Sequence, residues 1–378
     1  DQLMLTLSSS LKMDLTKKSS LNLGLALQTT KGMHYQTMED LLGASVFHNI
    51  NTYALGTYAT GSEQVQYDLN NPNGEVREGD KFGYNYNLLV DKANVWATYK
   101  HDFKFIHAFV SGRVGATSMQ RDGKMRNGLA ANNSYGKSGT ARFLDGGGKI
   151  GLNINLGRGN TVALGAGYEL RTPTAATSFA SPEINNDFVN NLKNEQVMSA
   201  ELGYQLRSSW LNLSLSGYYS RVKDGTEWQN FYYDDINSFS YVSFTGVEKE
   251  YYGAELGANI KLTSAFSVKL LGQISEAKYT DNTNVRYMNS TSAEYVDDIC
   301  ENGTPLTALS LGLSYHAGGW FIDLNGNYYD RIYLSYSPSF RYGKSLKNRQ
   351  DAYGDVYAPD GSIVDGILDQ AEGKGGFM

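Results

Sequence analysis

Every second residue is leucine in the segment Leu21-Asn22-Leu23-Gly24-Leu25-Ala26-Leu27-Gln28, and the residues between are small or polar. Similar alternation recurs over residues 150–156, 211–216 and 309–314. Because residues two apart share one face of a β-strand, each segment predicts a strand with an apolar face and a face of glycine, asparagine and serine. The polar faces of soluble sheets usually carry more charge. The pattern therefore favours a transmembrane β-barrel, with lipid outside and a wet or plugged interior, over a soluble β protein.

The alternating segments come in pairs joined by short turns, and long connections separate the pairs. Outer-membrane barrels have this arrangement, with tight periplasmic turns and large external loops. We therefore predict an all-β, antiparallel up-and-down transmembrane β-barrel, in which residues 1–378 form one partial barrel domain. The six predicted hairpins pair 2–15 with 20–33, 92–100 with 105–119, 145–156 with 161–172, 195–207 with 210–224, 247–262 with 266–284, and 306–317 with 320–333. The predicted extracellular loops are 34–91, 120–144, 173–194, 225–246, 285–305 and 334–375.

The composition agrees with a strand-rich chain and excludes several other classes. Among 378 residues there are 41 glycines, 6 prolines, 28 tyrosines and 15 phenylalanines. The single cysteine, Cys300, excludes an internal disulfide framework and a cysteine-rich zinc site. A net charge of −6 argues against a nucleic-acid partner. The strand-like segments at both ends look incomplete, so the chain is expected to be a piece of a longer wall.

The strand pattern also assigns side chains to faces and to depths. Seven charged residues fall on the small-polar face and are predicted to face the lumen, because a charge in the lipid is costly. They are Glu169, Arg171, Glu201, Arg207, Glu255, Lys261 and Asp323. Trp96, Trp210 and Trp320 lie near tight turns and are predicted to mark the membrane interface.

Two sets of loop residues are candidates for ligand binding. The loop 225–246 is crowded with aromatic side chains, which stack on sugar rings or planar ligands; they could equally pack against one another or over a plug. The loop 120–144 is basic and could receive an anionic ligand, or could be an ordinary solvated surface. The aromatic candidates are Trp228, Phe231, Tyr232 and Tyr233, and the basic candidates are Arg121, Lys124 and Arg126.

Motifs for catalysis, metals and cofactors are weak, so the prediction is that the protein is not an enzyme. The segment from Ala131 to Ser138 loosely matches a phosphate-binding loop, but it lacks the preceding buried strand and the following helix. His34 and His48 lie near acidic residues without a nucleophile motif. No catalytic residues, no metal site and no cofactor are predicted.

Several short motifs together resemble the barrel of TonB-dependent outer-membrane receptors, in the large group found in Bacteroidetes. No single motif is diagnostic, and the resemblance rests on their order and spacing. The motifs are Met38-Glu39-Asp40-Leu41-Leu42-Gly43-Ala44, Glu78-Gly79-Asp80-Lys81-Phe82-Gly83-Tyr84, Asn127-Gly128 with Asn133-Ser134-Tyr135-Gly136-Lys137-Ser138, Ser178-Phe179-Ala180-Ser181-Pro182, Ser216-Gly217-Tyr218-Tyr219 and Gly375-Gly376-Phe377-Met378.

The resemblance implies a barrel of about 22 strands, a plug domain inside it, and uptake of a scarce or bulky solute (iron chelate, corrinoid or glycan). The implied partners are the TonB–ExbB–ExbD complex, reached through a plug that these residues do not include, outer-membrane lipid and lipopolysaccharide, an unidentified small-molecule or glycan substrate, and a surface lipoprotein. The implied location is the outer membrane. A passive or structural porin-like barrel is the alternative, and a soluble β adhesin is a third.

Overall fold

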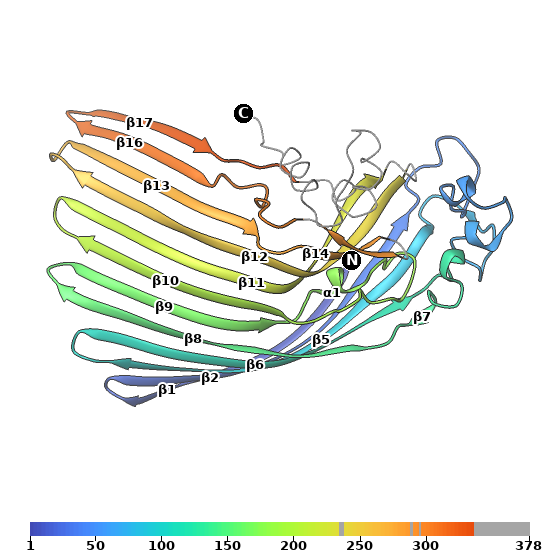
Figure 1. Cartoon of the computed structure of the whole chain (residues 1–378), viewed down its shortest axis with the longest axis horizontal. Helices are drawn as coiled ribbons and strands as arrows, with labels where there is room; N and C mark the ends of the chain where they lie inside the picture. Colours follow the sequence, from blue (N-terminus) through green and yellow to red (C-terminus); the bar gives the residue numbers. More distant parts are fainter. Residues whose placement is uncertain (234–237, 288–289, 295, 336–378) are drawn as a thin grey trace, which may run out of the picture.

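The computed structural model describes residues 1–335 except 234–237, 288–289 and 295, and it describes no side chains within 230–241 and 285–294. Within this part of the chain, one 15-stranded antiparallel sheet curls into an open trough (Figure 1). Twelve long strands follow one another across it. They are β1 (Gln2–Thr16), β2 (Ser19–Thr37), β5 (Lys81–Asp102), β6 (Ile106–Gly123), β8 (Ala141–Gly157), β9 (Asn160–Arg171), β10 (Glu195–Arg207), β11 (Leu211–Tyr233), β12 (Ser238–Lys261), β13 (Phe266–Tyr279), β16 (Thr307–Ala317) and β17 (Trp320–Asp330).

All six predicted hairpins are present, and each strand pairs with its neighbours in sequence. The tight turns share one end of the sheet (Figure 1). In the turn between β8 and β9, Gly157 and Gly159 both have φ of +83° and flank Arg158 at +53°. Glycine adopts this left-handed conformation without strain, which suits the sharp reversal. The barrel-type, antiparallel fold class predicted from the sequence is therefore correct.

Three external loops, 34–91, 120–144 and 225–246, are shorter than predicted, because the flanking strands continue into them. Of the predicted loop 225–246, most belongs to β11 and β12, which stay paired up to Tyr233 and Ser238. Val242 and Phe244 of β12 are buried there, so packing favours the longer ribbon. Loop 34–91 is reduced at both ends by β2 and β5, and it contains the short pair β3 (Phe47–His48) and β4 (Glu75–Val76). Most of loop 334–375 lies outside the described residues.

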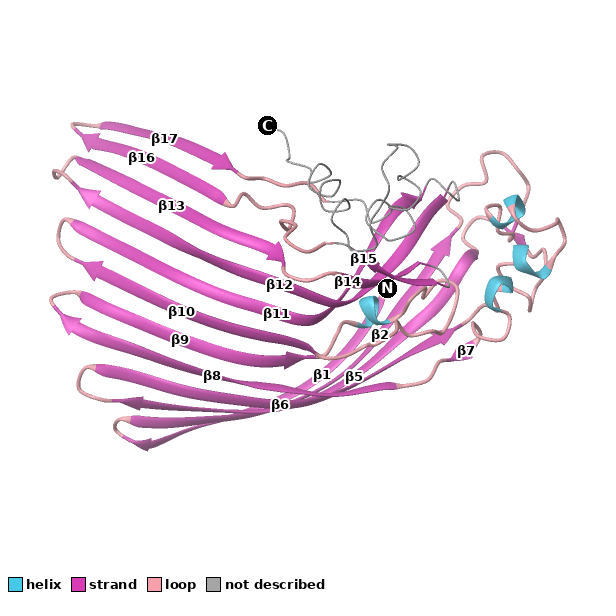
Figure 2. Cartoon of the chain, viewed as in Figure 1, coloured by secondary structure: helices cyan, strands magenta, loops and turns pink. Residues whose placement is uncertain are grey.

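Three further short strands attach to the main sheet. β7 (Gly136–Lys137) pairs with β6, while β14 (Thr283–Tyr287) pairs with both β12 and β15 (Ser290–Glu294). β15 lies inside the predicted loop 285–305, and β14 begins two residues before that loop and continues into it. Figure 2 shows that the helical turns, including α1 (Ala175–Ser178), lie at the end of the sheet away from the tight turns.

The leucine rows do not form a buried core. Leu5 and Leu144 are 69% and 76% exposed, and most leucines of the alternating segments are exposed likewise. Because cross-strand partners share a face, the pairing aligns them in continuous rows. One row is Leu7–Leu27–Ala93–Ala116–Leu144. An exposed apolar surface of this extent is typical of a protein that is covered by lipid or by another protein.

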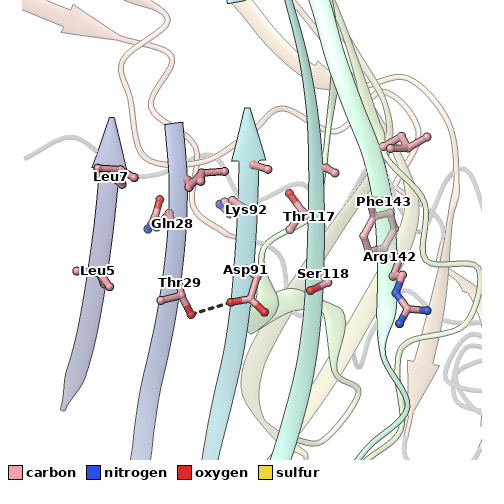
Figure 3. A pocket seen from close by; sticks show the side chains of 14 residues that line it. Leu5, Leu7, Gln28, Thr29, Asp91, Lys92, Thr117, Ser118, Arg142 and Phe143 are labelled. Atoms are coloured by element: carbon pink, nitrogen blue, oxygen red, sulfur yellow. Dashed lines mark hydrogen bonds between the residues drawn. The ribbon is translucent and has the colours of Figure 1, made fainter. Parts of the chain in front are cut away.

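A parallel row of more polar residues lies beside this leucine row (Figure 3). It consists of Leu5, Thr29, Asp91, Ser118 and Arg142. The Thr29 hydroxyl donates a 2.7 Å hydrogen bond to Asp91 Oδ1. Together the two rows border a groove of about 670 Å³ on the leucine face. Because the lining is mainly apolar and shares the leucine face, we interpret the groove as part of the lipid-contacting surface rather than as a solute site.

The buried core lies where loops and strand extensions meet. One cluster contains Val242, Phe244 and Val247 of β12 together with Tyr279, Val296 and Ile299. A second cluster contains Tyr86 and Leu88 of β5 with Phe179 from the segment after α1. No helix in the described part of the chain is long and apolar enough to cross a membrane.

Aromatic residues border the leucine face at both ends. Tyr219 and Tyr252 are paired on that face and exposed, and Trp210 and Trp320 are exposed beside tight turns. Trp96 differs from the prediction, because its indole lies on the opposite face against Gly24. A Cβ at Gly24 would come within 2.0 Å of that ring, so the glycine provides the space. Trp96 therefore packs inside the trough and does not mark the interface.

Candidate functional site: an aromatic cavity under the external loops

The polar face of the sheet is identified by the side chains that meet on it. Arg113 of β6 donates hydrogen bonds to Asp145 of β8 and Asn94 of β5. Tyr86 and Leu88 have the same strand parity as Asn94, and they pack against Phe179 from the segment after α1. Figure 1 shows α1 inside the curve of the sheet. The external segments 38–80, 124–140 and 172–194 therefore meet the wall at the polar face.

A cavity of about 470 Å³ lies between this wall and the loops. We call it the aromatic cavity, because rings make up much of its lining. The aromatic side chains that line it are Tyr53, Tyr67, Tyr84, Tyr86, Phe179 and Trp228, together with the imidazole of His34. Its polar and aliphatic lining comes from Gln36, Asn51, Asn127, Ser181, Glu183, Leu88, Ala176, Ala180, Pro182, Ile184 and Gly83. Its volume and its aromatic character are those of typical small-molecule sites.

Residues of β5 and β2 form the wall side of the cavity. Tyr84, Tyr86 and Leu88 occupy every second position of β5 and therefore project from one face. The His34 ring on β2 stacks on Tyr86, with centroids 4.9 Å apart and an interplanar angle of 5°. Burial lowers the pKa of His34, so at neutral pH the imidazole is uncharged. The wall therefore offers flat rings held by mutual contact.

The loop side of the cavity comes from the segment around α1. The Thr174 hydroxyl caps the helix by accepting a hydrogen bond from the Thr177 amide. Phe179 is almost completely buried and stacks on Phe188 at 4.5 Å. This packing positions Ser181, Pro182 and Glu183 at the cavity. Ser181 and Pro182 end the motif Ser178–Pro182 that was singled out in the sequence, and Glu183 follows it directly.

Loop 120–144 borders the cavity at Asn127, and local contacts fix the conformation of the loop there. Asn127 Oδ1 accepts a hydrogen bond from the Leu129 amide, and the Asn127 amide donates to Ser134 Oγ. Gly128 approaches the backbone of Glu63 so closely that a Cβ would lie 1.7 Å from the Glu63 carbonyl oxygen. Only glycine fits this contact, which gives the Asn127-Gly128 motif a structural role.

Arg121, a candidate for binding an anionic ligand in the basic loop 120–144, is instead buried, with 2% of its surface exposed. Its Nε donates to the Pro182 carbonyl at 2.6 Å, and its Nη1 donates to the Ser134 carbonyl and to Asn186 Oδ1. Burial lowers its pKa to about 10, so the guanidinium remains charged at neutral pH. The hydrogen bonds of Arg121 therefore hold the loops 120–144 and 173–194 against β6. Positive charge in a sequence does not reveal this, because a buried arginine and an exposed arginine look the same in a sequence pattern.

The other two basic candidates are not among the residues that line the aromatic cavity. Lys124 Nζ lies 2.5 Å from Asp122 Oδ2, and its side chain is partly exposed. Arg126 Nε donates to the Ala131 carbonyl at 2.7 Å. The structure therefore does not bring the three basic candidates together as one anion-binding surface.

Of the four aromatic candidates, Trp228 lines the cavity. Its neighbour Glu227 is held by Lys249, whose Nζ lies 2.5 Å from Glu227 Oε1 and 2.7 Å from Glu301 Oε1. The Lys249 side chain is buried, so this ion pair anchors β11 beside the cavity. The side chains of Phe231, Tyr232 and Tyr233 lie outside the described residues, and their binding role stays a prediction.

All seven charges predicted to face the lumen lie on the polar face with Arg113. Ion pairs and strand pairing establish this for Glu169, Arg171, Glu201, Arg207, Glu255, Lys261 and Asp323. Arg113 Nη2 lies 3.0 Å from Glu169 Oε1, and Arg171 Nε lies 3.8 Å from Glu169 Oε2 and 3.6 Å from Glu195 Oε1. Their contact with a lumen stays a prediction.

Sequence reasoning missed Arg113 and Asp145, the centre of this network. Asp145 is buried, and Thr117 and Thr172 also donate hydrogen bonds to its Oδ2. The sequence pattern could have identified Asp145. It lies an even number of residues from Asn153 and Asn155 on β8, so it belongs to the same small-polar face.

The electrostatics of the cavity are those of neutral rings beside a carboxylate. Burial and the nearby Glu183 carboxylate both raise the pKa of Tyr84. Burial also raises the pKa of Tyr67, with further contributions from Tyr53 and Glu183. These phenols are therefore protonated at neutral pH and can donate hydrogen bonds. Among the described residues, no cluster of three or more histidine, cysteine, aspartate or glutamate side chains could hold a metal ion.

A curved antiparallel sheet with an exposed leucine face, tight turns at one end and a loop-built cavity at the other defines a transmembrane β-barrel wall. Comparison with protein families agrees. A family model described as "TonB dependent receptor-like, beta-barrel" matches residues 14–360. The chain belongs to this family, and it is an outer-membrane protein. A search of curated protein sequences finds no match.

Solved structures of similar fold are transporters and receptors. The copper transporter OprC superposes with a TM-score of 0.59 at 15% identity, over 86% of this chain and 42% of that one. The siderophore receptor PiuA from Acinetobacter baumannii gives 0.55 at 12%, over 88% and 47%. The FrpB iron transporter from Neisseria meningitidis gives 0.53 at 12%, over 86% and 42%. At these identities the likeness shows the fold alone, and the chain spans less than half the length of these three proteins.

Proposed function

We propose that this chain forms wall and external binding loops of a TonB-dependent receptor that imports a scarce or bulky solute by energised, plug-gated uptake. The family supports this assignment. The observation that carries it is the aromatic cavity, which loops and wall build together on the polar face. A passive pore has no need for a preformed, ring-lined cavity at its mouth, whereas a receptor that captures a dilute solute does.

The proposed partners follow from the same assignment. A plug and the TonB–ExbB–ExbD complex would supply the gate and the energy. Lipid and lipopolysaccharide would cover the leucine face, and a surface lipoprotein could meet the external loops. The substrate would be an iron chelate, a corrinoid or a glycan, and the receptor would be of the Bacteroidetes type.

Dependence on energy separates this proposal from the porin-like alternative. Cells that express the receptor should take up its ligand only while the inner membrane is energised and TonB is present. Deleting TonB should leave surface binding intact and abolish uptake. Uptake that continues unchanged without TonB would contradict the proposal and favour a passive barrel.

Replacing Trp228 by alanine tests the cavity as the binding site. We expect Trp228→Ala to weaken the best ligand from a binding panel by about 2 kcal/mol, or roughly 30-fold, because the ligand loses its contact with the exposed indole ring. Trp320→Ala is the matched control, since Trp320 is exposed beside a tight turn at the other end of the sheet. If Trp228→Ala and the unchanged receptor bound the ligand with equal affinity, the aromatic cavity would not be the binding site.

A further inference from the structure

We propose that the groove on the leucine face binds one molecule of lipopolysaccharide, with an acyl chain of its lipid A in the groove and a lipid A phosphate on Arg142. The proposal rests on the proposed function, in which lipid and lipopolysaccharide cover the leucine face, and it gives one of those lipids a defined site. The groove has a volume of about 670 Å³. It lies on the face of the sheet opposite to the aromatic cavity.

The floor of the groove consists of two small side chains between larger ones. Ala93 of β5 and Ala116 of β6 are paired, and Leu27 and Leu144 are their neighbours in the same row (Figure 3). All four side chains are exposed. Because alanine projects only a methyl group, the two leucines form the sides of a hollow over β5 and β6. The hollow can hold an alkyl chain in close contact on several sides.

The depth of the groove matches the outer leaflet of the membrane. A transmembrane β-strand needs ~9–11 residues to cross the hydrocarbon. Ala93 lies about nine residues from the end of β5 at Asp102, and Ala116 lies about ten from the start of β6 at Ile106. The row of more polar residues is one step farther from the tight turns. The groove therefore lies where the outer acyl chains begin, and the polar row lies at the level of the headgroups.

Arg142 provides a positive charge at this level. It pairs with Ser118 in the polar row and lines the groove (Figure 3). Its side chain is exposed and makes no hydrogen bond or ion pair with another described residue. The carboxylate of Asp91, in the same row, is engaged by the Thr29 hydroxyl at 2.7 Å. Arginine binds phosphate through strong, charge-assisted hydrogen bonds, so a lipid phosphate is a suitable partner for Arg142.

A second cation lies farther out on the same face. Lys137 of β7 pairs with Asp122 of β6, which has the same strand parity as Ser118. Asp122 is engaged by Lys124, whose Nζ lies 2.5 Å from Asp122 Oδ2. The Lys137 side chain is exposed. Lipopolysaccharide carries phosphates on lipid A and further acidic groups above them, whereas a zwitterionic phospholipid balances its phosphate with an amine. Cations at two successive levels therefore favour lipopolysaccharide.

The test is native mass spectrometry of the intact receptor, freed of membrane lipid by detergent exchange. The probes are bisphosphoryl lipid A, monophosphoryl lipid A with the same acyl chains, and phosphatidylethanolamine. We expect bisphosphoryl lipid A to bind at least tenfold more tightly than phosphatidylethanolamine, with monophosphoryl lipid A between them. Equal binding of the three lipids, or dimerisation that excludes lipid A, would overturn the proposal. Neither result involves uptake, so TonB-driven transport would still stand.

Charge variants locate the phosphate. Arg142→Gln should weaken bisphosphoryl lipid A roughly fivefold, because one cation near the headgroups is lost. Lys149→Gln is the matched control, since Lys149 is an exposed cation of the same strand but has the parity of Asn153 on the polar face. It should change nothing. Unchanged binding in Arg142→Gln, or equal losses in the two variants, would overturn the phosphate site.

Filling the hollow locates the acyl chain. Ala93→Leu/Ala116→Leu should weaken bisphosphoryl lipid A about tenfold, because the new side chains occupy the space of the alkyl chain. Both alanines are exposed on the leucine face, so the larger side chains meet hydrocarbon and leave the fold intact. Ala200→Leu is the control, because Ala200 pairs with Tyr219 on the same face outside the groove. Lipid A binding that the double variant leaves unchanged would overturn the acyl site.

Discussion

Arginine in place of Leu152 is expected to destabilise the folded protein in lipid by about 2–4 kcal/mol. Leu152 lies on the leucine face of β8, near the tight turn, and 41% of it is exposed. It falls about halfway along the ~9–11 residues that a strand needs to cross the bilayer. An arginine there would place its charge in hydrocarbon. Urea unfolding in phospholipid vesicles measures the change.

The neighbouring residue provides the control for this substitution. Asn153 has the opposite strand parity and projects from the polar face. Asn153→Arg should therefore cost much less than Leu152→Arg, although the two substitutions introduce the same side chain one residue apart. Equal costs, or a larger cost at Asn153, would contradict the assignment of faces.

Removing Arg113 is the second change with a large expected effect. Arg113→Met leaves the Asp145 carboxylate without its closest cation, although only 5% of the Asp145 side chain is exposed. Breaking a buried ion pair from one side costs about 3–5 kcal/mol, because the remaining charge stays desolvated. The free energy of unfolding in lipid vesicles should fall by this amount, and part of the loss should return in Arg113→Met/Asp145→Asn.

Arg171→Met is the matched control for Arg113. The Arg171 side chain is half exposed, and its nearest carboxylate oxygens lie 3.6 and 3.8 Å away. Exposed pairs contribute about 0–1 kcal/mol, so this variant should unfold almost as the original does. If Arg113→Met proved as mild as Arg171→Met, the network would be a solvated surface cluster rather than a structural one.

The strands and their faces were predictable because period two is a local property. Leu23 and Gly24 face opposite ways whatever their neighbours are, and short glycine-rich turns such as Gly157–Gly159 show which strands pair. The extent of β11 and β12 was less predictable. Their continuation beyond residue 225 depends on burial of Val242 and Phe244 among residues from other segments, and a single strand does not reveal that packing.

Of the residues that line the cavity, only Trp228 was named from the sequence as a candidate for ligand binding. Its remaining lining comes from β2, β5 and the segments around Asn51, Asn127 and Glu183, which are far apart in the sequence. No local pattern brings them together. The positive charge of Arg121 led to a wrong expectation for the same reason. Only the folded structure shows that its guanidinium donates hydrogen bonds to carbonyl oxygens of the protein and does not face a ligand.

Spin labels placed successively at residues 150–155, on a Cys300→Ser background, test most directly which face meets lipid. Each label is assayed by collision with oxygen, which concentrates in hydrocarbon, and with a water-soluble nickel chelate. We predict that positions 150, 152 and 154 favour oxygen and positions 151, 153 and 155 favour nickel. Labels at Leu152 and Ile154 that collide with nickel, while those at Asn153 and Asn155 are shielded from it, would contradict the account.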